Sequence, residues 1–315
     1  MSQPPARRFS RIFIQWFSRL SLGTLRGFGR ILARMAYHSG KVSVVHNVKL
    51  NLAIAFPDMP EHEREDLAFQ AIRNEAISYC EFFHIWGADH QRNLKLIHTI
   101  YGEQRFHDAI QSPQGVVLVI PHFGTWEIMN AWFAKYTQMT IMYKPVKQAE
   151  LDDYVKSARS RDAAHLVPTD ERGIREILKA LKSGGTTVIL PDHSPDHGSD
   201  TTPYFGVPLY SSRLSAKLIQ KTKAHSLLVY AMRNTEGGFD LHVHDISDVF
   251  KDKSADQATY ALHQCLEGLI REHPQHYHWS YKRFHAHPHL RGLYDLPQDE
   301  ALKRIEACRK SIIEN

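Results

Sequence analysis

Residues 116–120, Val-Val-Leu-Val-Ile, are the feature of this sequence that most restricts its fold. The run is apolar at every position, which is typical of a strand buried on both faces, as in a parallel sheet. Gly115 precedes it, and Pro121 ends it because proline cannot donate to a strand ladder. A second run, residues 186–190, also ends at a proline, Pro191. Two such strands predict an α/β fold with a mostly parallel sheet.

The segments around these strands alternate in character, as they do in an α/β chain. The pattern predicts further strands at 139–143, 166–167, 226–232 and 239–243, and helices at 150–161, 171–182, 212–223 and 255–272. A hairpin is expected over residues 236–238, Glu-Gly-Gly, because this is a turn sequence. Residues 40–113 are expected to be helical and connecting, and residues 295–315 to be peripheral. We therefore expect an α/β fold whose mostly parallel central sheet is flanked by helices.

Length and charge limit the class of protein. The 315 residues, 43% hydrophobic and 23% charged, can form a sizeable core. The net charge of +5 and the pI of about 9.0 suit anionic phospholipid, phosphorylated glycolipid or an acidic carrier protein. No nucleic-acid-binding motif accompanies the charge, so no nucleic-acid partner is expected. Cys80, Cys265 and Cys308 are far apart, which favours a reducing compartment and argues against a disulfide framework.

Residues 8–36 carry an amphipathic pattern. On a helical wheel at about 100° per residue, the arginines fall within one arc of roughly 140°, opposite a face rich in phenylalanine and leucine. These arginines are Arg8, Arg11, Arg19, Arg26, Arg30 and Arg34. The longest uncharged runs, 12–18 and 20–25, are too short to span a bilayer, and no signal-peptide cleavage site follows.

Such a helix is expected to lie in the membrane interface, with packing on the domain as the alternative. Gly23, Gly27 and Gly29 are expected to bend or break it. We expect residues 1–39 to form this membrane-associated helix and residues 40–315 to form the α/β domain.

His122 and Glu127 lie where the first buried strand gives way to a helix that Thr125 is expected to cap. Open α/β sheets bind their ligands at the carboxyl ends of the strands. A carboxylate at this spacing can orient an imidazole and stabilise the imidazolium that forms when it takes a proton. No convincing serine or cysteine nucleophile lies nearby, which favours a base that deprotonates a substrate hydroxyl. On the pattern alone, a capping histidine beside a surface glutamate is an equal alternative.

These residues and several later blocks resemble a known family. His-Phe-Gly-Thr-Trp-Glu, residues 122–127, is similar to the His-x4-Asp/Glu motif of glycerolipid-type acyltransferases. The surrounding chain resembles the bacterial lipid A late acyltransferases, the lauroyl and myristoyl branch. Further blocks follow in the family's order at residues 143–145, at Arg159, and at residues 191–193, 204–208 and 273–284. His193 departs from the glutamine that often follows the aspartate in the family.

The resemblance implies acyl transfer at the cytoplasmic face of a bacterial inner membrane, with an N-terminal membrane anchor. The implied donor is a fatty acyl-carrier protein and the implied acceptor is a hydroxyl of a lipid A precursor. Because no protein nucleophile lies near His122, we expect the attack to be direct, and no cofactor is predicted. His122 is then the general base and Glu127 its orienting partner. The substrate-binding residues implied by the matched blocks and the basic cluster are Arg159, Lys144, Asp192, Phe205 and Gly206.

The basic cluster of Lys144, Lys147, Arg159 and Arg161 would by itself be an ordinary solvated face. If the acceptor is a phosphorylated glycolipid, the guanidinium of Arg159 suits bidentate contact with its phosphate.

Two dense histidine runs, residues 192–197 and 285–289, raise metal binding as an alternative. Neither matches a catalytic spacing such as His-Glu-x-x-His, so no metal is predicted. The other readings are an acyltransferase for a different membrane glycolipid, a metal-dependent hydrolase and a non-catalytic lipid carrier. The sequence does not specify the acyl chain length, the acceptor hydroxyl or the group that stabilises the oxyanion.

Overall fold

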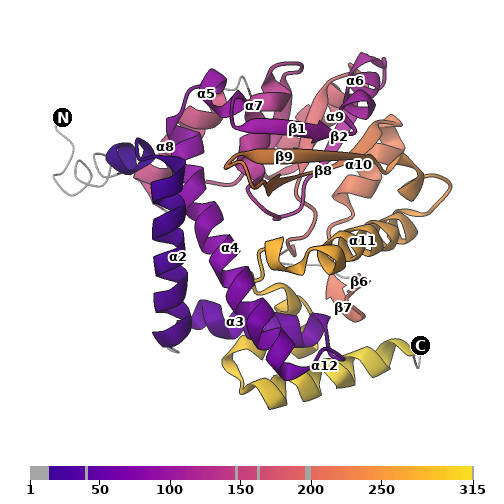
Figure 1. Cartoon of the computed structure of the whole chain (residues 1–315). Helices are drawn as coiled ribbons and strands as arrows, with labels where there is room; N and C mark the ends of the chain where they lie inside the picture. The colour runs from indigo at the N-terminus through magenta and orange to yellow at the C-terminus, as the bar shows by residue number, and fades with distance from the viewer. Residues whose placement is uncertain (1–13, 40–41, 146–147, 162–163, 196–199, 314–315) are drawn as a thin grey trace, which may run out of the picture. The chain divides into compact units, whose positions relative to one another are not determined.

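The computed structural model describes residues 14–39, 42–145, 148–161, 164–195 and 200–313 (Figure 1). Its main feature is a seven-stranded sheet in the order β1-β9-β8-β2-β5-β3-β4. The strands are β1 Ile97–Tyr101, β2 Val116–Val119, β3 Met139–Tyr143, β4 His165–Pro168, β5 Thr186–Ile189, β8 His225–Arg233 and β9 Phe239–Asp245. Neighbouring strands are parallel except β8 and β9, which form the predicted antiparallel hairpin. The prediction of a mostly parallel α/β sheet is confirmed.

β2 is the central strand and the core of this sheet. It pairs in parallel with β5 on one side and with β8 on the other. All its side chains are fully buried, as the apolar run predicts. The N–H of Ile120 still donates to the carbonyl of Ile189 at 2.9 Å, and Pro121 then leads the chain out of the sheet.

Helices pack against the sheet as expected. α6 (Glu103–Gln111) packs against β9, and α9 (Glu171–Lys182) packs against β3, β4 and β5. Asp170 caps the start of α9, because its carboxylate accepts from the backbone N–H groups of Arg172 and Gly173. The chain also forms α5 (His90–Leu94), η1 (Trp126–Ile128), α7 (Met129–Ala134) and α8 (Ala149–Arg161). The predicted helices at 150–161 and 171–182 are thus confirmed.

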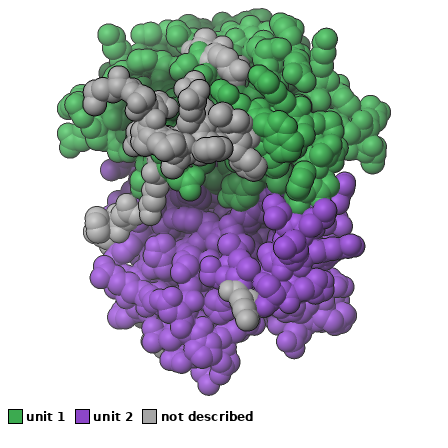
Figure 2. All heavy atoms as spheres, turned by 90° about the vertical axis from the view of Figure 1, so that its left-hand side faces the viewer, with its two compact units in different colours: residues 1–29, 77–189, 221–247 green, residues 30–76, 190–220, 248–315 purple. Residues whose placement is uncertain are grey.

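The chain divides into two compact units, which Figure 2 colours separately. The first comprises residues 1–29, 77–189 and 221–247 and holds the whole seven-stranded sheet. The second comprises residues 30–76, 190–220 and 248–315. Both α2 (Leu22–Ser39) and α4 (Glu61–Gly87) contribute residues to each unit. The division into a membrane helix at 1–39 and one domain at 40–315 stays a prediction.

The second unit is built on α3 (Ser43–Ala55), α11 (Ala255–Glu272), α12 (Gln298–Ile313) and a hairpin of β6 (Thr201–Tyr204) and β7 (Val207–Tyr210). α10 (Leu214–Thr222) begins in it. α11 packs on β6, and α12 packs on α3 and β7.

Three parts of the fold differ from the sequence-based expectation. β1 lies within residues 40–113, which were expected to be helical and connecting with no strand, and the β6–β7 hairpin was not predicted. Residues 295–315 were expected to be peripheral, but α12 buries Ala301, Ile305 and Cys308. α12 is therefore part of the second unit's core.

The N-terminal helix is interrupted. Residues 14–18 are helical, residues 19–21 break the helix, and α2 follows. The break was expected at glycines, but Gly23, Gly27 and Gly29 all lie inside α2. The predicted positions Arg8 and Arg11 lie outside the described residues, as do the phenylalanines at positions 9 and 13. Among the described helices, none combines the length and the apolar character needed to cross a bilayer.

Candidate active site

The chain makes a tight turn directly after β2, centred on His122. The N–H of Phe123 donates to the carbonyl of Pro121 at 2.8 Å, which closes a three-residue turn. Gly124 follows with a φ of +58° and forms an isolated parallel bridge with Ala231 of β8. A Cβ on Gly124 would lie 2.1 Å from the carbonyl oxygen of Ala231, so only glycine fits there. The turn thus places His122 at the carboxyl end of the central strand.

The His122 ring is half-buried against aromatic side chains. It meets the indole of Trp126 edge to face, with the ring centroids 5.0 Å apart. Trp126 in turn packs on Phe82 of α4, which is buried, with centroids 4.7 Å apart. These contacts orient the imidazole while part of the ring stays accessible, as a general base requires.

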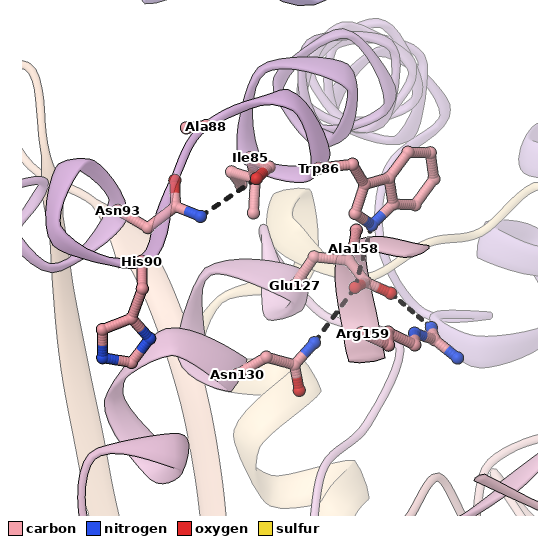
Figure 3. Close-up of a pocket in the computed structure, with 9 residues that line it drawn as sticks. All are labelled: Ile85, Trp86, Ala88, His90, Asn93, Glu127, Asn130, Ala158 and Arg159. Atoms are coloured by element: carbon pink, nitrogen blue, oxygen red, sulfur yellow. Dashed lines mark hydrogen bonds and ion pairs between the residues drawn. The ribbon is translucent and has the colours of Figure 1, made fainter. Parts of the chain in front are cut away.

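Glu127 lies in η1 and is only 3% exposed. Trp86 Nε1 donates to its Oε2 at 3.0 Å, and Asn130 Nδ2 donates to the same oxygen at 3.1 Å. Arg159 Nη2 donates to its Oε1 at 2.5 Å. Figure 3 shows these side chains converging on the carboxylate from α4, α7 and α8. The alternative of a surface glutamate at this position is therefore wrong.

The main contact of Arg159 is its ion pair with Glu127. Burial opposes the charge of its guanidinium, but the facing carboxylate outweighs burial and raises the pKa of Arg159. The guanidinium also lies over the ring of Tyr143, with Cζ 5.5 Å from the centroid. Its side chain remains 22% exposed. Its predicted contact with substrate stays a prediction.

Lys144 follows β3 and is exposed, as a contact for a phosphorylated headgroup would be. Nearby, Lys156 of α8 pairs with Asp152 at 2.7 Å. An open pocket of about 360 Å³ has Tyr143 and Lys156 in its wall, and lies between α8 and the ends of β3 and β4. Its volume falls in the range of small-molecule sites. Lys147, part of the predicted basic cluster, lies outside the described residues.

A much smaller cavity lies behind Glu127, lined in part by Ile85, Asn93 and Asn130 (Figure 3). Its volume of about 10 Å³ suits about one water molecule. Asn93 donates from Nδ2 to the carbonyl of Ile85 at 2.9 Å, and its buried Oδ1 has no hydrogen-bond partner. The cavity is too small for an acyl chain or a sugar, so on this side Glu127 faces the protein interior.

Thr125 does not cap the helix, contrary to the prediction. Its side chain makes no cap hydrogen bond to η1. Its fully buried hydroxyl instead donates to Oε2 of Glu81 at 2.6 Å. Nη2 of Arg233 donates to the same hydroxyl oxygen at 3.2 Å. The loop between His122 and Glu127 is therefore tied to a buried ion pair.

Asp192, Phe205 and Gly206 belong to the second unit. Asp192 has no exposed surface. Phe205 and Gly206 form the β6–β7 turn with φ values of 48° and 71°. The N–H of Phe205 donates to Glu267 at 2.7 Å, and its carbonyl accepts from Arg309 at 3.0 Å. These contacts give the turn a structural role, and substrate binding by the three residues stays a prediction.

Within the described residues, no group of three or more His, Cys, Asp or Glu side chains is arranged to hold a metal ion. Asp196 and His197 of the first histidine run lie outside these residues. In the second run, Nδ1 of His287 accepts from the backbone N–H of His289 at 3.3 Å and lies 3.6 Å from Sγ of Cys308. Burial lowers the pKa of His287.

The sequence matches one protein family over most of its length. A family model described as bacterial lipid A biosynthesis acyltransferase matches residues 10–286. The chain belongs to this family. The protein is therefore an acyltransferase of lipid A biosynthesis, and the resemblance inferred from its motifs is confirmed. Membership of this family argues against the two alternative hypotheses, a metal-dependent hydrolase and a non-catalytic lipid carrier.

Individual relatives of this lipid A biosynthesis acyltransferase are distant. It is 26% identical over 278 residues to the lipid A biosynthesis acyltransferase of Haemophilus influenzae, covering 85% of this chain and 86% of the relative. It is 23% identical over 267 residues to the lipid A biosynthesis lauroyltransferase of Escherichia coli K12, covering 83% and 84%. Among solved structures, it is similar to the 1-acyl-sn-glycerophosphate acyltransferase PlsC of Thermotoga maritima, with a TM-score of 0.35 and 12% identity, covering 84% and 97% of the two chains.

The sequence did not reveal four residues around the loop of this lipid A biosynthesis acyltransferase. Trp86 and Asn130 hold Glu127, and Glu81 and Arg233 hold Thr125. None of the four lies in a motif. Asn130 follows Glu127 by three positions, a helical spacing that gives the one local signal.

Proposed function

We propose that this lipid A biosynthesis acyltransferase moves a fatty acyl chain from acyl-carrier protein to a hydroxyl of a lipid A precursor, with His122 as general base. The observation that supports this proposal most directly is the turn after β2. It sets His122 at the carboxyl end of the central strand, five positions before the buried carboxylate of Glu127. A base there can take a proton from a hydroxyl bound at the edge of the sheet.

The proposed nucleophile is the acceptor hydroxyl rather than a protein side chain. Thr125, which shares the loop with His122, is fully buried, and its hydroxyl donates to Glu81. Ser78, which faces that hydroxyl at 3.2 Å, is 1% exposed. Neither hydroxyl can reach a thioester without breaking buried hydrogen bonds, which supports direct transfer without an acyl-enzyme.

In the proposed reaction, His122 removes the proton of the acceptor hydroxyl as its oxygen attacks the thioester carbonyl carbon. A C–O bond forms, the C–S bond breaks, and the imidazolium returns its proton to the departing thiolate. The products are the acyl ester and the free thiol of the carrier, and no cofactor is consumed. The charge of Glu127 stabilises the imidazolium, and its hydrogen bonds to Trp86, Asn130 and Arg159 hold it in place.

We place the enzyme at the cytoplasmic face of the inner membrane, held by α2. Phe28, Ile31, Leu32 and Met35 recur at the spacing of one helical face and are 42–64% exposed. The arginines at positions 30 and 34 of the same helix are exposed and suit anionic headgroups. This combination is typical of a helix that lies in the interface.

Transfer from a fatty acyl-carrier protein to a purified lipid A precursor tests the base. His122→Ala should fold and lower transfer by roughly 10²-fold or more, the usual scale for loss of a general base. His62→Ala, which removes an exposed histidine of α4, is the matched control. Turnover close to wild type in folded His122→Ala would contradict the proposal.

Two further assays test the substrates. Replacing the carrier by the matching acyl-coenzyme A should reduce transfer, and equal turnover with both donors would contradict a carrier-specific site. Mass spectrometry of lipid A from cells with and without the protein tests the acceptor. Unchanged lipid A together with a new acyl chain on another glycolipid would support the alternative acceptor.

A further inference from the structure

A buried ion-pair cluster in the first unit lies against the loop that carries His122. We call it the Glu81 cluster, and its members are Glu81 of α4, Arg233 of β8, Arg26 of α2, Ser78 and Thr125. The Glu81 side chain is fully buried, and the side chains of Arg26 and Arg233 are 11% and 13% exposed. The reaction proposed above gives these residues no chemical step.

Both arginines of the Glu81 cluster bind the same carboxylate. Nε of Arg233 lies 2.9 Å from each oxygen of Glu81, and Nε of Arg26 lies 2.6 Å from Oε1. Oε2 also accepts the hydroxyl of Thr125 at 2.6 Å. Arg233 Nη2 donates to both Thr125 and Ser78. Hydrogen bonds to charged partners are the strong ones, so this buried hydroxyl is firmly held.

Thr125 connects this cluster to the loop, three positions after His122 and two before Glu127. The preceding residue, Gly124, bridges to Ala231 on the strand that carries Arg233. Two adjacent residues of the loop are thus fixed, one to the backbone of β8 and one to the ion pair. A helix cap would have fixed the hydroxyl only to its own helix, whereas these contacts set the loop relative to the sheet.

We infer that Thr125 is a positioning residue, through which the Glu81–Arg233 pair holds the loop so that His122 and Glu127 keep their productive placement. The inference rests on the proposed role of His122. Small displacements matter here, because a misplacement of about 1 Å can lower turnover on the order of 10²-fold.

Thr125→Val removes the hydroxyl at nearly constant shape, and Thr187→Val is the matched control. Thr187 of β5 is also fully buried and donates at 2.7 Å, but to the carbonyl of Thr140 inside the sheet. Thr125→Val should lower kcat by roughly 10- to 100-fold with little change in KM for the acceptor. Thr187→Val should match it in loss of thermal stability and keep wild-type kcat. Thr125→Ser, which keeps the hydroxyl, should restore kcat.

Arg233→Lys is a second variant in case Thr125→Val does not fold. The ammonium keeps the charge opposite Glu81 but cannot reach Glu81, Ser78 and Thr125 together, so kcat should again fall at unchanged KM. Wild-type kcat per folded molecule in Thr125→Val or Arg233→Lys would overturn the inference. So would equal losses of kcat in Thr125→Val and Thr187→Val.

A double variant separates this inference from the proposed base. In a His122→Ala background, Thr125→Val should lower residual transfer no further, because the loop then has no base to position. A further fall of full size would overturn the positioning role and leave the base intact. Loss of activity in His122→Ala together with full activity in Thr125→Val would likewise overturn the positioning role and leave the base intact. Full turnover by His122→Ala would refute the base and, with it, the inference.

Discussion

Arg159 donates a 2.5 Å hydrogen bond from Nη2 to Oε1 of the buried Glu127 carboxylate, which joins α8 to η1, the short helix that follows the loop after β2. Trp86 and Asn130 occupy Oε2 of the same carboxylate. Glu127 is thus fixed in place, and its proposed effect on His122 comes from its charge at a set position. Arg159 in turn compensates the cost of burying that charge.

Glu127→Gln should separate the contribution of the Glu127 charge to stability from its contribution to acyl transfer. The amide keeps the shape but leaves the mostly buried guanidinium of Arg159 without its counter-charge, so we expect a loss of about 3 kcal/mol or less in the free energy of unfolding. Transfer should fall by roughly 10²-fold, since the imidazolium loses its stabilising charge. Urea unfolding and steady-state transfer measure the two effects.

The double variant Glu127→Gln/Arg159→Met serves as its control. Replacing a buried ion pair by uncharged side chains is often neutral for stability, so the free energy of unfolding should recover. Transfer should not recover. Recovered transfer would mean that Glu127 acts only by supporting the fold.

Arg159 and Lys144 should respond differently to the phosphate of the acceptor. Arg159→Ala should lower kcat for phosphorylated and unphosphorylated acceptors alike, because it releases Glu127. Lys144→Ala removes an exposed charge, so it should raise KM for the phosphorylated acceptor alone, by about fivefold at low salt. Steady-state kinetics on both acceptors test this prediction. If Arg159→Ala loses the preference for the phosphorylated acceptor and Lys144→Ala keeps it, then Arg159 rather than Lys144 contacts the phosphate.

His263 should make the folded protein sensitive to mild acid. Burial, followed by the charge of Arg283, lowers the pKa of His263 to about 3. Its Nδ1 lies 2.9 Å from the carbonyl of Pro203, and since a carbonyl only accepts, Nδ1 carries the proton of the neutral ring. Below the unfolded-state pKa of about 6.5, the His263 imidazole binds a proton in the unfolded chain but stays neutral in the folded protein. This contribution to stability is therefore present above pH 6.5 and is lost as the pH falls toward 3.

Urea unfolding at pH 7, 6 and 5 measures this dependence. The slope from one such group approaches roughly 1.4 kcal/mol per pH unit below pH 6.5. His263→Gln should reduce the slope by this amount, whereas His62→Gln, at an exposed position, should leave it unchanged. An unaltered slope in His263→Gln would assign the acid sensitivity to other groups.

Local pattern was enough to predict the elements with a regular burial pattern. β2, β3 and β5 are short strands with mostly buried side chains, and the amphipathic helices α9 and α11 were predicted residue for residue. The missed elements lack such a pattern. β1, Ile-His-Thr-Ile-Tyr, lies on the edge of the sheet, and all five of its residues are at least partly exposed. β6 contains Pro203, which argues against a strand in a single sequence.

The candidate site likewise contains a part that the sequence predicted and a part that it did not. His122 lies in the short loop after β2 and Glu127 in η1 directly after it, so their proximity along the chain follows from the sequence itself. Arg159 lies 32 positions from Glu127, and Thr125 lies 44 positions from Glu81. Such contacts depend on how α4 and α8 pack, and no local pattern encodes that packing. Thr125 was therefore assigned to a helix cap, the one role that its immediate neighbours suggest.

The apolar face of α2 should hold the enzyme on anionic membranes. Deleting the whole N-terminal segment would be a poor test, because Leu25 is fully buried and Arg26 binds Glu81. Ile31→Glu/Met35→Glu changes only side chains that are 58% and 64% exposed, so the fold should persist. Each full burial of such a side chain contributes about 1.5–3 kcal/mol, and interfacial burial yields part of this.

The two added carboxylates would also be repelled by anionic lipid, so binding to vesicles should fall by tenfold or more, as a loss of about 1.4 kcal/mol implies. Flotation with anionic vesicles measures binding, and Tyr260→Glu, on an exposed position of α11, is the control. Transfer to a detergent-dispersed acceptor should remain close to wild type, since both substituted side chains are exposed and belong to the second unit, whereas the loop after β2 belongs to the first. If Ile31→Glu/Met35→Glu floats as fully as the wild type and the control, α2 is not the principal membrane contact, because its exposed face then contributes no measurable binding energy.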